Sequence, residues 1–189
     1  EVSNYIPAGV HVMTQGENGI LGIGPVPDDM HADARVTNAG GALVTINPGG
    51  CYFDSVTAFG MIRGGHINAV VLGALQVDEA GNLANWIVPG KRVPGMGGAM
   101  DLVVGAQRVI IAMEHTAKGE AKILKKCTLP LTATGEVDLI VTEKCVMNVC
   151  PGGGLILTEL SPLVSLDELR AVTGADFTVS PRLKTMNAD

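Results

Sequence analysis

Three short apolar runs, rich in β-branched residues, constrain the fold of this chain more than any other feature. They are Ala69–Gly73, Val109–Met113 and Leu139–Thr142. Continuous apolar runs of this length are typical of strands that are covered on both faces of a sheet. Helical or loop stretches separate them, as they separate the parallel strands of an α/β fold. The pattern therefore predicts the α/β class, as a three-layer α/β/α fold with a mostly parallel central sheet.

Weaker signals indicate the other elements. Val10–Gln15 alternates enough to predict a strand that ends at Gly16, and Gly154–Leu160 predicts an edge strand. Ser165 and Glu168 have the spacing of a capping box, which opens a last helix through Val172. Further predicted elements are helices over Tyr52–Ile62 and Leu102–Gln107 and turns at Asn47–Gly50 and Asp78–Asn82.

Length and composition set the broad class. The chain has 189 residues, 47% of them hydrophobic, and no linker or repeat, which predicts one domain over residues 1–189. The net charge of -6 argues against nucleic-acid partners. No apolar run approaches the roughly 20 residues of a membrane span, and no basic-then-apolar leader precedes Glu1. The four cysteines lack CxxC spacing and suit reduced thiols. We expect a soluble cytoplasmic protein.

The segment TQGENGILG sets one carboxylate, Glu17, among three glycines. Asn18-Gly19 is a common hairpin turn signal, so one interpretation leaves Glu17 facing solvent. The sequence that follows, Ile20–Pro25, is too apolar and glycine-rich for the outer strand of an exposed hairpin. A glutamate is ionised at neutral pH and can act as a nucleophile without a general base. Both interpretations stay open on these residues alone.

A second segment, Val93–Asp101, carries successive glycines and opens a predicted helix. Such a loop presents backbone N–H groups that suit a phosphate, a carboxylate or an oxyanion. It lacks the Lys-Ser/Thr pair of a P-loop, and a purely structural glycine turn fits as well. The only tryptophan, Trp86, and the adjacent cations Lys91 and Arg92 precede it. Trp86 is also compatible with simple packing of a surface loop.

The sequence shows neither a metal-binding motif nor the motif of a serine or cysteine acyl-enzyme. The four histidines show no metal-ligand spacing, so no metal is proposed. The chain has no GxSxG motif, and no cysteine has a histidine near it in the sequence. Acyl transfer through serine or cysteine is therefore not predicted.

In these segments the chain resembles the beta subunit of a 3-oxoacid coenzyme A transferase of the acetate, butyrate or succinyl type. The resemblance runs from about Asn4 to the C-terminus. The segments that carry it, in order, are Gln15 with Glu17–Gly19, Phe53–Ser55, Met61–His66, Leu83–Trp86, Pro89–Lys91, Gly95–Asp101 and Met113–His115.

The resemblance implies roles for particular residues. Glu17 would attack the acyl-CoA thioester and carry CoA as a glutamyl thioester in a ping-pong reaction. Asn18, Lys91 and the amides of Gly97, Gly98 and Ala99 would bind CoA or substrate. CoA is then a substrate, and no cofactor is expected. The expected acids are short-chain carboxylic or 3-oxo acids such as acetoacetate, used in ketone-body or short-chain fatty-acid metabolism. An alpha subunit would complete a hetero-oligomer.

The sequence departs from the family pattern at two places. Family members usually carry Ser before the glutamate, where this chain has Gly16. They also begin earlier, with a helix and a first strand that we expect to be absent before Glu1. Two other functions stay open beside the transferase. One is a non-catalytic binding or scaffold subunit with Glu17 on a solvated turn, and the other is an acyl-CoA hydrolase in which water captures the acyl group.

Overall fold

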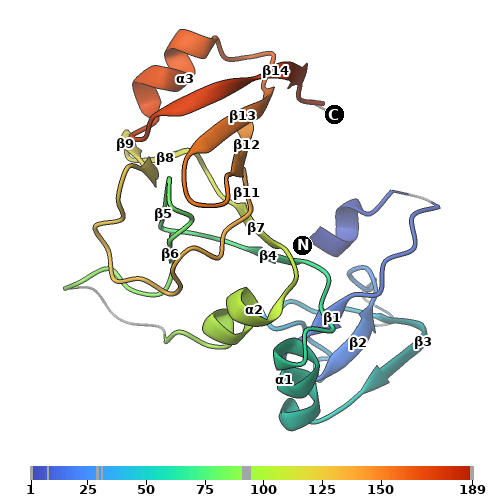
Figure 1. The fold of residues 1–189 in the computed structure, drawn as a ribbon. Helices are drawn as coiled ribbons and strands as arrows, with labels where there is room; N and C mark the ends of the chain where they lie inside the picture. Colours follow the sequence, from blue (N-terminus) through green and yellow to red (C-terminus); the bar gives the residue numbers. More distant parts are fainter. Residues whose placement is uncertain (1, 8, 29, 31, 91–94, 188–189) are drawn as a thin grey trace. The chain divides into compact units, whose positions relative to one another are not determined.

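The computed structural model describes residues 2–7, 9–28, 30, 32–90 and 95–187. The chain forms two compact units, Glu1–Gly64 and Gly65–Asp189, which are described separately (Figure 1). Each unit contains strands and at least one helix, so the predicted α/β class is confirmed. The prediction of one domain over residues 1–189 stays a prediction.

The first unit is built on an antiparallel sheet in the order β1-β2-β3 (Figure 1). Ile20 and Ile23 of β2 are buried, and they pack against Val44 and the half-buried Val36 and Ile46. These aliphatic side chains form a small core of their own. The elements of this unit are a 3-10 helix η1 (Val2–Tyr5), strands β1 (Gln15–Gly16), β2 (Ile20–Ile23) and β3 (Ile46–Tyr52), and helix α1 (Ser55–Arg63).

Two predictions for the first unit need correction. Of the strand expected over Val10–Gln15, only its last residue lies in β1, because Val10, Val12 and Met13 are exposed and pair with no described strand. The turn expected at Asn47–Gly50 lies inside the edge strand β3. Its residues bulge out of the ladder, where the register shifts between Leu21 and Ile23, and edge strands tolerate such Pro and Gly residues.

The helix expected over Tyr52–Ile62 is confirmed as α1, with a later start. Asp54 sets that start, because its side chain accepts a hydrogen bond from the Thr57 N–H. That hydrogen bond lowers the pKa of Asp54. A residue whose side chain satisfies a free amide of the first turn is a strong helix-start signal. The predicted boundary missed this cap.

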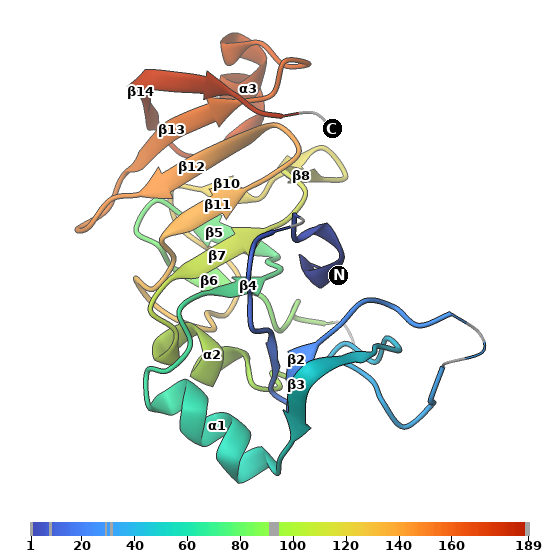
Figure 2. The ribbon, with the colours of Figure 1, turned by 90° about the vertical axis from the view of Figure 1, so that its right-hand side faces the viewer.

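The second unit is organised around a six-stranded sheet in the order β14-β13-β12-β11-β7-β4, and Figure 2 shows these strands one below another. Strands β4, β7 and β11 pair in parallel, β11, β12 and β13 pair antiparallel, and β14 pairs parallel with β13. The strands of this sheet are β4 (Val70–Leu72), β7 (Val109–Ala112), β11 (Leu139–Val141), β12 (Cys145–Val149), β13 (Leu155–Leu160) and β14 (Phe177–Thr185).

The three apolar runs of the sequence are therefore neighbours in one sheet, as β4, β7 and β11. The sheet as a whole is mixed, because short connections at β11–β12 and β12–β13 reverse the chain direction. The strand predicted over Gly154–Leu160 exists as β13, but it lies inside the sheet between β12 and β14, so the edge assignment was wrong. The three-layer arrangement stays a prediction.

Smaller elements complete the second unit. Strands β10, β5 and β6 form a second sheet, and β8 pairs with β9. Helix α3 begins at the predicted capping box, in which the Ser165 side chain and the Glu168 side chain each hold the other's backbone N–H. The bounds are β5 (Gln76–Asp78), β6 (Leu83–Ala84), β8 (Thr116–Ala117), β9 (Glu120–Ala121), β10 (Ile123–Leu124), α2 (Ala99–Gly105) and α3 (Leu166–Val172).

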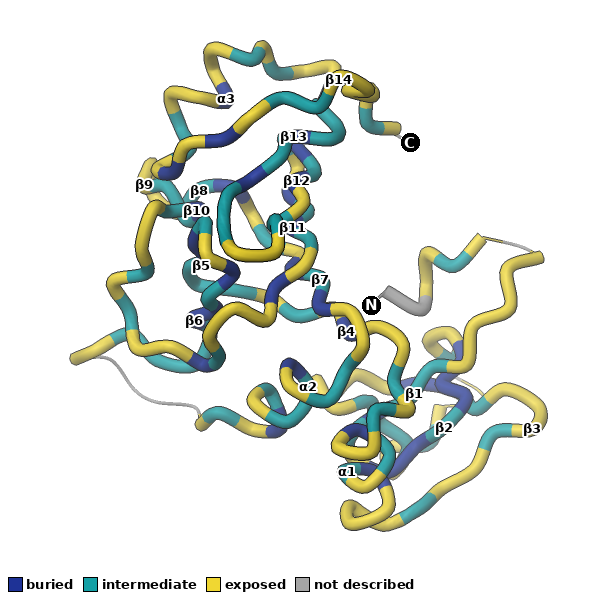
Figure 3. Tube along the Cα trace, viewed as in Figure 1, coloured by how far each residue is buried: buried dark blue, intermediate teal, exposed yellow. Residues whose placement is uncertain are grey.

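The main core of the chain lies in this second unit. Aliphatic residues from both of its larger sheets and from α2 and α3 are fully buried there, and Figure 3 shows the dark-blue segments along β5, β7 and β11 to β13. Ile111, Ile140 and Leu157 contribute side chains with no exposed surface. Burial of such a side chain contributes about 1.5–3 kcal/mol to folding. Burial of the apolar side chains of its strands thus stabilises the six-stranded sheet.

Candidate functional site

Glu17 lies in the turn Glu17–Gly19 that joins β1 to β2. The strands pair as Gln15 with Leu21 and Gly16 with Ile20, and the Gly19 N–H donates to the Gly16 carbonyl at 3.0 Å. The Asn18-Gly19 turn signal was therefore correct. Ile20, the residue that begins β2, is 4% exposed and belongs to the apolar core of the first unit, so the turn that holds Glu17 leads directly into a buried strand.

Gly19 fits this turn because it has no side chain. Its φ of +107° is in the left-handed region, which glycine adopts readily. A Cβ at this position would overlap the carbonyl oxygen of Phe53. The Phe53 N–H in turn donates to the Gly19 carbonyl at 2.9 Å. The turn is thus held against the segment that precedes α1, a contact between distant parts of the chain that sequence reasoning missed.

The Glu17 side chain is half-buried, and its Oε2 atom is buried without a hydrogen-bond partner. Among the described side chains it is the only buried nitrogen or oxygen atom of this kind. Buried polar groups are nearly always hydrogen-bonded, so an exception calls for an explanation. A carboxylate oxygen that has lost water without gaining a donor is poorly stabilised and therefore reactive. A fully solvated turn residue would not show this feature.

The predicted donor loop lies in the second unit. Gly98 is the N-cap of α2 and is buried, and Gly97 has a φ of +57°. The helix was expected at Leu102–Gln107 but runs Ala99–Gly105, because the glycines end directly at its first turn. The Ala99 N–H donates to the Met96 carbonyl at 3.4 Å, a long hydrogen bond. The binding role of Gly97, Gly98 and Ala99 stays a prediction, and Lys91 lies outside the described residues.

Trp86 takes the structural role that its surroundings suggested. Its ring N–H donates to the Leu131 carbonyl at 3.3 Å. The neighbouring Asn85 accepts a hydrogen bond from the Thr132 hydroxyl at 2.7 Å and donates to the Gly73 carbonyl at 3.2 Å. These residues fasten loops of the second unit to one another.

Asp78 is a buried carboxylate that sequence analysis treated only as part of a turn. It is 1% exposed and accepts hydrogen bonds from the N–H groups of Ala80, Asn82 and Cys127 and from the Asn82 side chain. Burial alone would raise the pKa of Asp78, but these hydrogen bonds lower it below its usual value. The contrast with Glu17 is informative, because a structural carboxylate in this chain is fully satisfied.

A second buried cluster joins a histidine to a cysteine, which the sequence spacing did not reveal. His115 Nδ1 lies 3.1 Å from the Thr142 hydroxyl and 3.7 Å from Cys145 Sγ, and Nε2 lies 2.9 Å from the Thr173 hydroxyl. Burial lowers the pKa of His115 and raises the pKa of Cys145 to about 11. A thiol and a neutral imidazole result, so this pair is not an activated nucleophile.

We expect His115 to make the stability of the protein depend on pH. Its folded-state pKa is below the ordinary 6.5, so the stabilisation is fully present above pH 6.5 and is lost as the pH falls from there toward the folded-state pKa. His115→Gln, which does not titrate, should flatten this decline in urea midpoints measured between about pH 7.5 and about pH 5. The exposed His66→Gln is the matched control. Equal slopes for the wild type and His115→Gln would contradict the assignment.

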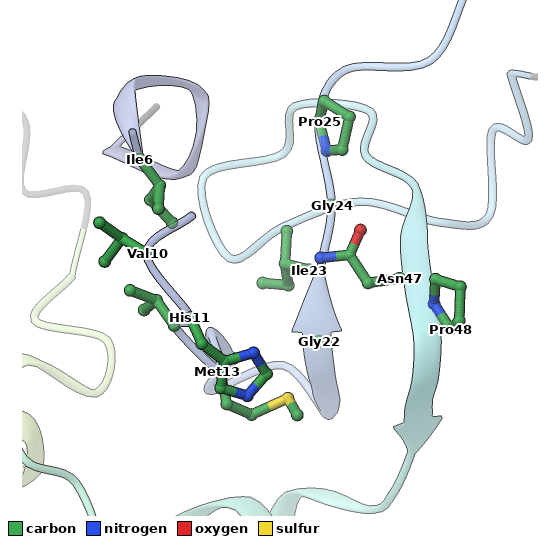
Figure 4. Close-up of a pocket in the computed structure, with 11 residues that line it drawn as sticks. Ile6, Val10, His11, Met13, Gly22, Ile23, Gly24, Pro25, Asn47 and Pro48 are labelled. Atoms are coloured by element: carbon green, nitrogen blue, oxygen red, sulfur yellow. The ribbon is translucent and has the colours of Figure 1, made fainter. Parts of the chain in front are cut away.

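The first unit also contains an open hollow of about 360 Å³ (Figure 4). It lies between the segment that holds Val10 and Met13 and the strands β2 and β3, and His11 and Asn47 are its polar side chains. None of the predicted site residues that the structure describes lines it. The hollow is therefore distinct from the glutamate turn.

The described part of the chain contains neither a candidate metal centre nor a candidate membrane-spanning helix. No group of three or more His, Cys, Asp or Glu residues there is arranged to hold a metal ion. No helix in the same residues has the length and apolar character required to cross a bilayer.

Comparisons with known proteins agree with the sequence resemblance. The family model described as coenzyme A transferase matches residues 2–171. The acetate CoA-transferase subunit beta of Escherichia coli (strain K12) is 54% identical over 189 residues, which cover 100% of this chain and 86% of that protein. The mitochondrial succinyl-CoA:3-ketoacid coenzyme A transferase 2B of Mus musculus is 54% identical, over 97% of this chain but 36% of that protein.

A solved structure gives the same result for the fold. An acyl-CoA transferase apoenzyme from Escherichia coli O157:H7 superposes with a TM-score of 0.70 at 22% identity. The match covers 90% of this chain and 34% of that one. The likeness extends over most of this chain and concerns the fold alone.

Proposed function

Because this chain belongs to the coenzyme A transferase family, we propose that it is a catalytic subunit in which Glu17 moves CoA from an acyl-CoA to a short-chain carboxylic or 3-oxo acid. The observation that carries the proposal is the buried, unpartnered Oε2 atom of Glu17. It supports a nucleophile and disfavours both a solvated turn and a scaffold role. CoA is a substrate in this proposal, and no cofactor is required.

The first half-reaction moves CoA onto the enzyme. A Glu17 carboxylate oxygen attacks the carbonyl carbon of the acyl-CoA, the C–S bond breaks, and an acyl-glutamyl anhydride and CoA thiolate form. The thiolate then attacks the glutamyl carbonyl carbon, which releases the donor acid as its carboxylate. The enzyme is left as a glutamyl-CoA thioester. No proton and no redox equivalent is needed in either step.

The second half-reaction repeats these steps in reverse with another acid. The acceptor carboxylate attacks the glutamyl thioester, and CoA thiolate leaves. The thiolate then attacks the acceptor's acyl carbon in the new anhydride, which gives the product acyl-CoA and restores the Glu17 carboxylate. The kinetics are ping-pong, because the first product leaves before the second acid binds.

The glycine loop completes the proposal. The amides of Gly97, Gly98 and Ala99 stay predicted contacts of CoA or substrate, as the sequence resemblance implies, and the Ala99 N–H also donates to the Met96 carbonyl at 3.4 Å. Asn18 and Lys91 stay predicted contacts of CoA or substrate. The use of acetoacetate, the cytoplasmic location and the three-layer arrangement of the family also belong to this proposal.

Mass spectrometry tests the function directly. Incubation of this chain, mixed with an alpha subunit of the same family, with an acyl-CoA should add the mass of CoA less one water to the peptide that contains Glu17, and hydroxylamine should convert this adduct to a hydroxamate at Glu17. The absence of an adduct with every acyl-CoA tried would overturn the proposal. CoA release that needs no acceptor acid would favour the hydrolase alternative. An acceptor-dependent rate would favour the transferase.

We further propose that an alpha subunit completes the active enzyme. Two relatives that this chain covers over most of their length are named as subunit beta of an acetate CoA-transferase, and this name implies a partner subunit in those proteins. In this chain Val10, Val12 and Met13 are each about half exposed, and apolar side chains gathered on a surface favour a partner.

The expected result is that the isolated chain turns over acyl-CoA slowly and gains activity when mixed with an alpha subunit of the same family. Sedimentation of the chain alone and of the mixture, run beside a transfer assay, checks both parts. A monomer with full activity and no gain on mixing would contradict the shared enzyme.

A further inference from the structure

The Glu17 carboxylate depends on its backbone for orientation, because no side chain or amide holds Oε2. Its backbone is fixed at several points of the turn. The Gly19 N–H donates to Gly16, the Phe53 N–H donates to Gly19, and the Asn18 side chain reaches a separate loop. A change at one of these anchors would alter the backbone from which the carboxylate extends. The residues that form them are therefore candidates for control of the reaction.

Asn18 is the side-chain anchor among them. Its Nδ2 atom donates to the Thr37 carbonyl at 2.7 Å. Thr37 belongs to a loop that backbone contacts hold closed. Thr37 forms an isolated β-bridge with Leu43, and the neighbouring Val44 N–H donates to the Val36 carbonyl at 3.2 Å. Val36 and Val44 pack on the core under β2. Through Asn18, the glutamate turn is thus tied to the same core from a second side.

Gly16 makes room for this anchor. A Cβ built at Gly16 would lie 2.7 Å from Asn18 Oδ1 and 3.0 Å from Ile23 Cδ1. The Asn18 amide therefore folds back over the Gly16 backbone while its nitrogen reaches Thr37. Because both neighbours are the ends of flexible side chains, a methyl group at position 16 would be accommodated cheaply. The methyl group would fit only after the Asn18 side-chain amide had moved away from it.

We infer that Asn18 is a positioning residue for Glu17, and that Gly16 and Asn18 form a matched pair that sets where the carboxylate lies. The inference rests on the proposed function of Glu17 and assigns Asn18 a different role from substrate binding. A small residue at position 16 leaves the amide free to hold Thr37. The hydrogen bond of the Asn18 amide then fixes the Glu17–Gly19 segment, and with it the position of the Glu17 carboxylate oxygen.

A double-mutant cycle tests the pair. Asn18→Ala should lower kcat roughly tenfold and leave KM for acyl-CoA within about twofold, because misplacing a reacting group slows the chemical step. Gly16→Ala should lower kcat severalfold in the wild type with little change in melting temperature. In the Asn18→Ala background the same change should have little effect. Asn68→Ala is the matched control, because it removes an exposed amide in the second unit that donates to the Gln107 side chain at 3.2 Å, and it should leave kcat unchanged.

The outcomes separate this inference from the proposed function. If Glu17 forms the CoA adduct but Asn18→Ala keeps its kcat, or raises only KM, positioning is wrong and the function stands. If no adduct forms, the proposed function is wrong. Hydrogen exchange of the Asn18 side-chain amide then tests separately whether Gly16 and Asn18 are coupled. The Asn18 side-chain amide should exchange slowly in the wild type and faster in Gly16→Ala. Equal exchange in both proteins would overturn the coupling.

Discussion

Replacing Glu17 with glutamine is expected to lower the transfer rate by roughly a thousandfold or more while the protein stays folded, because loss of a covalent nucleophile has effects of at least this size. Glutamine has nearly the same shape, but its amide cannot form the anhydride or the glutamyl thioester. Since Oε2 is buried without a donor, exchanging the charged oxygen for a neutral amide should also leave the melting temperature at least as high. Turnover and thermal unfolding measure the two effects.

Two controls make this result specific. Glu120→Gln removes the same charge from an exposed position in β9 of the second unit and should leave turnover unchanged. Mass spectrometry of the peptide that carries the Glu17→Gln substitution excludes deamidation back to glutamate during purification. Retention of about a tenth or more of the wild-type rate by a verified Glu17→Gln protein would rule out the nucleophile. A marked loss of stability would instead make Glu17 a structural residue of the turn.

Local sequence signals predicted much of the second unit. Ala69–Gly73, Val109–Met113 and Leu139–Thr142 became strands β4, β7 and β11 because a β-branched apolar run can satisfy one buried environment, the centre of a sheet. The Ser165–Glu168 capping box predicted the start of α3 for a similar reason, since all its groups lie within one turn. These signals are complete within a few residues.

Predictions failed where the outcome depends on a distant partner. Val10–Gln15 has the alternation of a strand, yet a strand forms only where another one pairs with it. The position of β13 inside the sheet depends on β14, which follows a helix. The hydrophobicity of Gly154–Leu160 carries no information about that later strand. Pairing order is thus the part of this fold that local pattern cannot specify.

The candidate site shows the same division. Glu17 was singled out as the candidate nucleophile from TQGENGILG and the resemblance, because the glutamate and its glycines are adjacent in the chain. The contacts of Asn18 with Thr37 and of Gly19 with Phe53 join segments that are distant in the sequence, and no spacing rule predicts them. The missing hydrogen bond of Oε2 is likewise a property of the folded turn. The sequence thus names a candidate residue, but it does not give the contacts that hold the turn of that residue.

The second large effect is expected for Gly19→Ala, which should destabilise the first unit by about 2–4 kcal/mol and abolish transfer. Two separate causes add. An alanine at a φ of +107° is strained, and its Cβ would overlap the Phe53 carbonyl oxygen, a backbone atom that cannot turn away. Relief of that overlap requires the turn to leave Phe53, which breaks the 2.9 Å hydrogen bond between them and displaces Glu17.

Gly49→Ala separates the two causes, because Gly49 also has a positive φ, of +86°, but a Cβ there would meet nothing within 4 Å. It should carry only the cost of the strained backbone, about 1–2 kcal/mol, and leave most of the activity. Urea midpoints and transfer rates for both variants make the comparison. Similar losses of stability and activity in the two proteins would mean that the contact with Phe53 does not hold the turn, and that Glu17 is oriented by other contacts.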